Sequence, residues 1–233
     1  ADPDTLTHNA IYKDASEIVQ DPSMLFYGVS KAIWMTRDAL KFDRTPIWFK
    51  IAELIGECES IAHSSNGDFV WAGTATYSAS GSNGRLYRIK GLRDVNYGYT
   101  EHAEIRYYTD TISNDTFYYA HGLFDLDSAG IDRTLITSPF GGDTWGKVVT
   151  AVAVDPNNSA HVVVGLGNYD GQPDHIYESI NALDSMPTFT SIKGIGLIGT
   201  PVYSLLIDQT DSELIYAGTE FGVYRTENGN GNG

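Results

Sequence analysis

Short runs of alternating apolar and polar residues recur along the whole chain and predict β-strands. Clear examples are residues 69–73, 161–165 and 214–218. Each run is bounded by Asn, Asp, Gly or Pro, as expected for strands that end in tight turns. Apolar residues with helical spacing are scarce, so the pattern predicts an all-β protein.

One strand motif returns at a nearly constant interval. Five segments that end in glycine start at residues 25, 69, 117, 161 and 214. An apolar strand and a polar turn precede most copies, and a third strand follows at residues 32–37, 85–89, 175–179 and 223–226. A fourth strand follows in places, at residues 47–51 and 188–192. This spacing matches the ~40–50 residues of a four-stranded propeller blade.

The repeat favours a β-propeller over a β-sandwich, because a sandwich does not predict one motif about every 45 residues. We expect four-stranded blades near residues 15–53, 57–100, 103–147, 148–193 and 201–229. Stacking such sheets buries faces that one sheet alone leaves exposed.

The predicted blades place residues 1–229 in a single propeller domain or propeller segment. Residues 230–233 form a Gly/Asn tail or the start of a linker. The last blade lacks a clear fourth strand, which residues 6–12 could supply by pairing with the other end of the chain. A closed five-bladed ring and a part of a larger ring of about seven blades remain alternatives.

Two segments resemble the turn of Asp-box propellers, the BNR, sortilin and xyloglucanase-like repeat family. Residues 220–229 read Glu-Phe-Gly-Val-Tyr-Arg-Thr-Glu-Asn-Gly, similar to that family's third strand and turn. Residues 137–145, Thr-Ser-Pro-Phe-Gly-Gly-Asp-Thr-Trp, resemble "S-x-D-G-G-x-T-W", and residues 36–38 are a worn copy. Two positions depart from the motif: Phe140 stands where the motif has Asp, and Asn228 takes that place in the last copy. The resemblance covers most of the chain, blade by blade, and implies a fold rather than an activity.

Two enzyme branches of this family fit the sequence poorly. Sialidases need three arginines, a Tyr nucleophile and a Glu partner, whereas arginine is scarce here and the Arg-Ile-Pro signature is absent. Xyloglucanases place two tandem propellers around a cleft, which 233 residues cannot form alone.

One acidic loop is a candidate calcium site. Asp125, Asp127 and Asp132 form the pattern D-x-D-x-x-G-x-D with a glycine for a sharp turn. Calcium takes several oxygen ligands, so these carboxylates are suitable donors. The loop lacks the bidentate Glu of an EF-hand, and the alternative is a polar loop in which the aspartates cap turns.

A second loop, at residues 168–175, interrupts a hairpin that is short in the 214–226 copy. Its Asp170 and Asp174 are the candidate acid/base pair of a glycosidase, since that chemistry needs two carboxylates across a sugar bond. The six histidines show no metal-ligand spacing and are expected to be satisfied strand or turn residues. Cys58 is expected to be a small buried side chain.

Charge narrows the classes of partner. The chain has 15 Lys and Arg against 30 Asp and Glu, a formal net charge of -15. This charge repels phosphate backbones, so we expect no nucleic-acid partner. No run of ~18 uncharged apolar residues exists, so no membrane-spanning helix is expected. A single cysteine excludes an intrachain disulfide framework.

The sequence therefore favours a non-catalytic binding or scaffolding propeller that mediates protein–protein interaction. Rim aromatics are candidates for the contact surface: Tyr77, Tyr97, Tyr99 and Tyr169. The alternative is a glycoside hydrolase or polysaccharide-binding propeller. The acidic charge, the start at Ala1 and the secreted proteins of the family predict an exported bacterial protein, extracellular or at the cell surface. A trimmed cytosolic protein is the alternative.

Overall fold

The chain is built from strands, as its pattern predicts. A computed structural model describes residues 24–37, 39–40, 48–79, 81–93, 104–109, 111–114, 116–123, 130–169, 174–197 and 199–226. These residues contain seventeen strands and no helix, which confirms the all-β class. A membrane-spanning helix is accordingly absent from these ranges.

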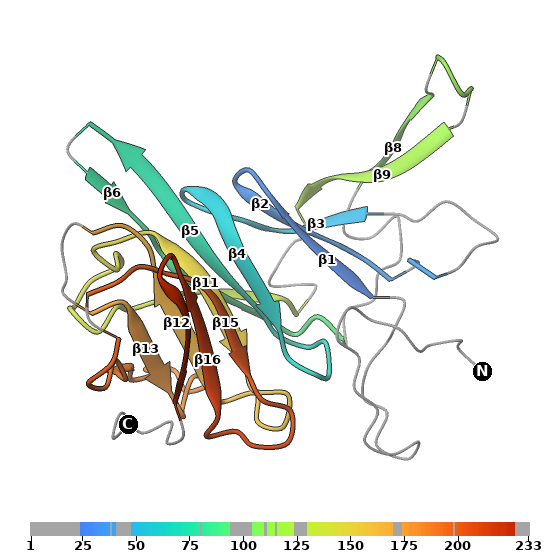
Figure 1. Ribbon diagram of the computed structural model, residues 1–233. Helices are drawn as coiled ribbons and strands as arrows, with labels where there is room; N and C mark the ends of the chain where they lie inside the picture. Colours follow the sequence, from blue (N-terminus) through green and yellow to red (C-terminus); the bar gives the residue numbers. More distant parts are fainter. Residues whose placement is uncertain are drawn as a thin grey trace.

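The strands form four sheets (Figure 1). The first sheet has the order β1 (Leu25–Val29), β2 (Ala32–Thr36), β3 (Trp48–Glu53), β9 (Thr116–Leu123) and β8 (Glu104–Thr109). The second contains β4 (Glu57–His63), β5 (Val70–Ser78), β7 (Leu86–Lys90) and β10 (Asp132–Ile136), with β6 (Gly81–Asn83) on β5. The third contains β11 (Val149–Val154), β12 (Val162–Leu166), β13 (Ile176–Ser179) and β14 (Thr190–Ser191). The fourth contains β15 (Val202–Ile207), β16 (Ile215–Thr219) and β17 (Gly222–Thr226).

The sheets differ from the predicted blades at one place, because residues 103–147 do not form a sheet of their own. The β8–β9 hairpin extends the first sheet through a parallel pairing of β9 with β3 and projects away from the other sheets (Figure 1). β10 instead adds a fourth strand to the second sheet by pairing with β7. Alternation marks a strand but not its partner, so the motif at residues 117–122 could not reveal this arrangement.

The other four predicted units each contain one sheet, and these sheets pack against one another in chain order. The strands β1, β4, β11 and β15 contact each other in succession, as Figure 1 shows for the last three. We call the face of a sheet that meets the preceding sheet its front face, and the opposite one its rear face. The described strands do not close into a ring, and residues 6–12, predicted to pair with the last sheet, lie outside the described residues.

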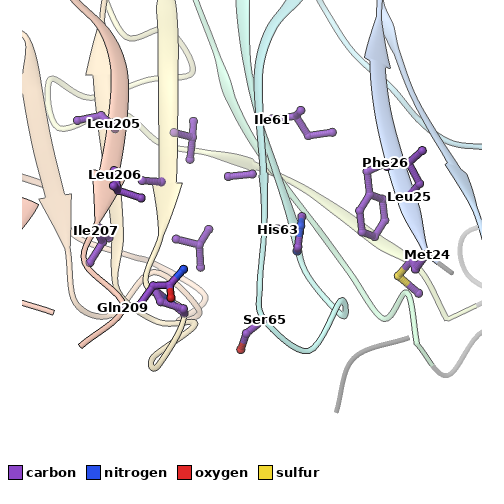
Figure 2. A pocket seen from close by; sticks show the side chains of 15 residues that line it. Met24, Leu25, Phe26, Ile61, His63, Ser65, Leu205, Leu206, Ile207 and Gln209 are labelled. Atoms are coloured by element: carbon purple, nitrogen blue, oxygen red, sulfur yellow. The ribbon is translucent and has the colours of Figure 1, made fainter. Parts of the chain in front are cut away.

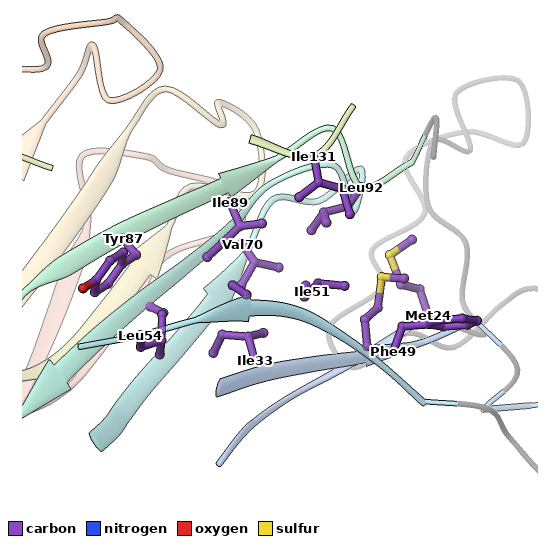
Figure 3. Packing of buried hydrophobic residues seen from close by; sticks show 13 residues of the cluster. Met24, Ile33, Phe49, Ile51, Leu54, Val70, Tyr87, Ile89, Leu92 and Ile131 are labelled. Carbon is purple, nitrogen blue, oxygen red and sulfur yellow. The ribbon is translucent and has the colours of Figure 1, made fainter. Parts of the chain in front are cut away.

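Three apolar clusters fill the three junctions between consecutive sheets. Figure 3 shows the first, in which Ile33, Phe49 and Ile51 of the first sheet pack against the second sheet. Trp71 of the second sheet lies in the next cluster with the front face of the third. Val163 of the third sheet lies in the last cluster with the front face of the fourth. Burial of apolar surface between sheets is therefore the main stabilising contribution.

The repeated glycine has a specific role in these junctions. A Cβ atom added to it would lie closer than 3.0 Å to a side chain on the first strand of the next sheet. The pairs are Gly28 with Cys58, Gly73 with Val149, and Gly165 with Val202. In β4, β11 and β15 this partner residue directly precedes a β-bulge. Glycine recurs because the next sheet approaches too closely for any side chain.

Candidate functional site

A cavity lies between the first strands of successive sheets. It has a volume of about 420 Å³ and is lined by residues on or directly beside β1, β4, β11 and β15. Figure 2 shows side chains of these strands on both sides of the cavity. The stacking of the sheets therefore creates a cavity to which all four sheets contribute.

The lining of this cavity is apolar and carries no acidic or lysine side chain. Its polar side chains are His63, Ser65 and Gln209, which the close-up places on β4, after β4 and after β15 (Figure 2). The ring of His63 lies 5.7 Å from that of Phe26, centroid to centroid. Mostly apolar linings with a few polar groups are typical of binding pockets. The cavity can bury apolar groups, and it offers no carboxylate for acid/base chemistry.

The predicted calcium loop is described only at its end. Asp132 begins β10 with an exposed side chain, and its Oδ2 atom lies 3.1 Å from Nζ of Lys90. Asp125 and Asp127 lie outside the described residues, so the calcium site stays a prediction. Within the described ranges no group of three or more His, Cys, Asp or Glu side chains could hold a metal ion.

The predicted carboxylate pair is likewise described at one member. Asp174 accepts a hydrogen bond from Nζ of Lys193. Burial opposes ionisation of Asp174, but the hydrogen bond from Lys193 and the positive charge of Lys193 outweigh burial and lower the pKa of the carboxyl group. Asp174 is thus suited to be an ionised group held by lysine, not a general acid, which needs a raised pKa. Asp170 lies outside the described residues.

A buried cluster of three titratable groups joins β11, β12 and β13. The Nδ1 atom of His161 lies 3.0 Å from Oδ2 of Asp155, and its Nε2 atom lies 2.7 Å from Oε1 of Glu178. Burial opposes the charge on His161, but the hydrogen bonds to Glu178 and Asp155 outweigh it and raise the pKa of the imidazole. Burial also opposes ionisation of Asp155, yet hydrogen bonds, led by the one from Ser212, lower the pKa of Asp155.

Sequence reasoning did not identify this cluster. The Asp155-Pro156 turn was recognisable, because Asp commonly begins such turns and here accepts the amide of Asn157 at 2.7 Å. Nothing in the spacing of His161 and Glu178 showed that both side chains point to the same buried place. The three side chains are almost fully buried, so the geometry of the cluster fits a structural role.

A second buried group lies where the 168–175 loop leaves the third sheet. Nζ of Lys147 donates to the carbonyl of Asn168 at 3.0 Å, and the lysine is fully buried. Nδ1 of His175 lies 3.1 Å from the carbonyl of Leu166, to which it donates. Burial, helped by the nearby Lys147 charge, lowers the pKa of His175. These side chains hold both ends of the loop that carries Asp174.

The connection between β13 and β14 is a turn held by a single amide. Oδ1 of Asn181 accepts hydrogen bonds from the amide of Thr188 at 2.9 Å, from its hydroxyl at 3.1 Å and from the Ser179 hydroxyl at 3.1 Å. Phe189, at the end of the turn, packs at 5.1 Å against the ring of Trp145. The sequence suggested such a turn at residues 137–145 and 220–229 instead.

The segment 137–145 is not the turn inside a separate blade at residues 103–147 that its sequence predicts. It connects β10 to β11, between the second and third sheets. Trp145 is fully buried, and Phe140 packs edge to face on Tyr177 at 5.4 Å. The aspartate of this segment, Asp143, is exposed. In the later copy, the residues after Thr226 lie outside the described part.

Comparison with known proteins does not assign the chain to a family. No family model matches the sequence, and no curated protein matches it. Among solved structures, the chain is similar to the crystal structure of an ancestral GH74 enzyme, with 15% sequence identity and a TM-score of 0.48. The match covers 90% of this chain and 22% of that enzyme, so the chain spans about a fifth of its length. A TM-score of this size does not establish a shared fold.

Proposed function

We propose that the four sheets are consecutive blades of an Asp-box-type β-propeller. Three features support this: the face-to-face stacking in chain order, the bulge and glycine repeated at each junction, and the turn organised by Asn181. Asn181 and Phe189 take the places of the family's Asp and Trp, since one bonds the turn and the other packs into the sheet.

We further propose that this propeller is a protein-binding module that takes an apolar segment of its partner into the cavity between the first strands. The observation that carries this proposal is the cavity itself, to whose mostly apolar lining all four first strands contribute apolar side chains. Apolar contacts supply most of the binding energy in such pockets, and the polar groups at the edge supply orientation. Tyr77 and Tyr169 are exposed and add aromatic surface elsewhere on the molecule.

A selection for binding peptides tests this function. Peptides selected on the wild-type chain should be rich in apolar residues, and Ala62→Phe, which adds a ring at the wall of the cavity, should weaken their binding at least tenfold, about 1.4 kcal/mol, while the unfolding midpoint shows whether the sheets stay packed. Ser185→Phe places the same ring on an exposed loop and is the control. Peptides that bind both variants equally would show that the cavity is not the binding site.

The alternative function is a glycoside hydrolase or polysaccharide-binding propeller. It requires a second carboxylate about 5–10 Å from Asp174 in an open groove. The pairing of Asp174 with Lys193 does not favour this chemistry. Turnover of any oligosaccharide on a glycan array, lost in Asp170→Asn, would replace the binding function with this one. An extracellular or cell-surface location also stays a prediction, and fractionation of the source cells would test it.

A further inference from the structure

The rear face of the fourth sheet carries exposed apolar side chains, and no described strand covers it. Its inward residues belong to the junction with the third sheet, and the alternate residues point to the opposite side. On that side Val223 is 75% exposed, and Leu206, which also borders the cavity, is 56% exposed. Tyr203, at the bulge of β15, and Phe221, in the β16–β17 turn, are also exposed. Contiguous exposed apolar side chains commonly mark an interaction surface.

The same positions are buried on the third sheet. Leu206 pairs with Tyr216 in the fourth sheet as Ala153 pairs with Val163 in the third. Val223 lies opposite the repeated Gly218 as Ile176 lies opposite Gly165. Ala153, Val163 and Ile176 are all buried in the cluster that the fourth sheet covers. The rear face of the fourth sheet is therefore a junction surface without its second half.

The repeated glycine supports the same conclusion. Gly28, Gly73 and Gly165 each leave space that the first strand of the next sheet fills. At Gly218 an added Cβ would meet only Ser204, which belongs to the same sheet. This glycine retains the space for an approaching strand, although no described strand occupies it.

The front face of the first sheet is the complementary surface. In the three later sheets, the residue before the repeated glycine pairs across the strands with a tyrosine of the third strand. This tyrosine packs against the preceding sheet. The pairs are Ala72–Tyr87, Val164–Tyr177 and Ala217–Tyr224. The first sheet has Tyr27–Trp34 at this position. Tyr27 is 57% exposed, and its ring lies 6.5 Å from that of Trp48. The front face of the first sheet is therefore not covered by any other described sheet.

We propose that two copies of this chain associate head to tail, with the rear face of the fourth sheet of one copy packed on the front face of the first sheet of the other. A sheet whose front face carries this repeat would fit the rear face of the fourth sheet, and the first sheet of this chain has such a front face, which no other described sheet covers. Such a contact is heterologous, so each copy uses two different surfaces. The net charge of -15 opposes association, so salt strengthens it.

Variants of one face each provide the test. Sedimentation and light scattering from about 1 to 100 µM protein should show self-association of the wild type that grows with salt. Val223→Glu and Tyr27→Glu should each weaken it at least tenfold, about 1.4 kcal/mol. Both side chains are exposed, so the variants should keep the far-ultraviolet spectrum and unfolding midpoint of the wild type. Met186→Glu, an exposed site in the β13–β14 turn, is the control and should associate normally.

Mixing distinguishes this contact from any symmetric one. Val223→Glu keeps an intact first sheet and Tyr27→Glu keeps an intact fourth sheet, so an equimolar mixture should form a one-to-one complex that neither forms alone. A wild type that stays monomeric over the whole range would overturn the proposal. So would a mixture that forms no complex, or association that both face variants leave unchanged.

Discussion

The Nε2 atom of His161 lies 2.7 Å from Oε1 of Glu178, and both side chains are more than nine-tenths buried. Asp155 lies 3.0 Å from the other ring nitrogen, so the imidazole, when protonated on both nitrogens, donates to a carboxyl group on each side. A buried imidazolium offsets part of the charge of two buried carboxylates, and loss of its proton leaves those carboxylates without that compensation. The arrangement links the first three strands of the third sheet and makes their stability depend on pH.

The sign of this dependence follows from the two shifted groups. The pKa of His161 is raised, so its contribution is complete below the ordinary value of 6.5 and is lost as the pH rises through the folded value. The pKa of Asp155 is lowered, so its contribution is complete above the ordinary value of 3.8 and is lost as the pH falls through the folded value. Urea unfolding across pH should therefore show a loss of stability on the alkaline side of 6.5.

Replacing His161 tests the source of that loss. His161→Phe leaves two buried carboxylates facing an apolar ring and should lower the free energy of unfolding by about 3–5 kcal/mol near neutral pH. It should also remove the decline above pH 6.5. His175→Gln is the matched control, because His175 has a lowered pKa and its replacement should leave the alkaline decline intact. A decline that persists in His161→Phe would assign the effect to another group.

The junctions between sheets can be predicted from the sequence better than the candidate sites can. The sequence shows the glycine repeat because Gly73 and Gly165 both lie where the next sheet approaches too closely for a side chain, so no other residue can replace them. The prediction of a separate blade at residues 103–147 is wrong because the strands of a hairpin added at a sheet edge show the same alternation of apolar and polar residues as the strands of a blade. The Asn181 turn was missed because Asn and Phe189 replace the expected residue types. The contacts of His161 depend on side chains that only the folded sheet brings together.

The steric task of Gly73 gives a direct prediction. Gly73→Ala would place a Cβ 2.6 Å from the backbone carbonyl of Val149 in the next sheet. Because this atom is backbone, the two sheets must separate, and the cost should be about 1–3 kcal/mol or more. Gly196→Ala is the control, since nothing lies within 4 Å of the added Cβ, and it should change stability by less than about 0.5 kcal/mol. Equal unfolding midpoints for both variants would contradict the close approach of the sheets.

The stability of the turn held by Asn181 should depend on both Asn181 and Asp184, which are joined by a hydrogen bond. Asn181→Ala removes the acceptor of three hydrogen bonds and should cost about 1–2 kcal/mol in urea unfolding. Asn181→Asp keeps the acceptor but faces Asp184, whose Oδ2 now accepts the Asn181 amide at 3.2 Å. Combining Asn181→Asp with Asp184→Asn reverses the donor and the acceptor and should recover stability relative to Asn181→Asp. A double variant no more stable than Asn181→Asp would show that the pair does not organise the turn.

Trp145 predicts two substitutions of very different cost. Its ring is fully buried between Tyr177, at 6.1 Å, and Phe189, at 5.1 Å, centroid to centroid. Trp145→Ala leaves a large cavity at the junction of the second and third sheets and should cost about 3–5 kcal/mol. No described residue accepts a hydrogen bond from the buried Nε1 atom, so its desolvation opposes folding. Trp145→Phe keeps the edge-to-face contacts and removes that nitrogen, and should therefore cost much less than Trp145→Ala. Urea unfolding followed by circular dichroism measures both variants, and similar losses for the two would show that an unseen partner, such as a water molecule, satisfies the indole nitrogen.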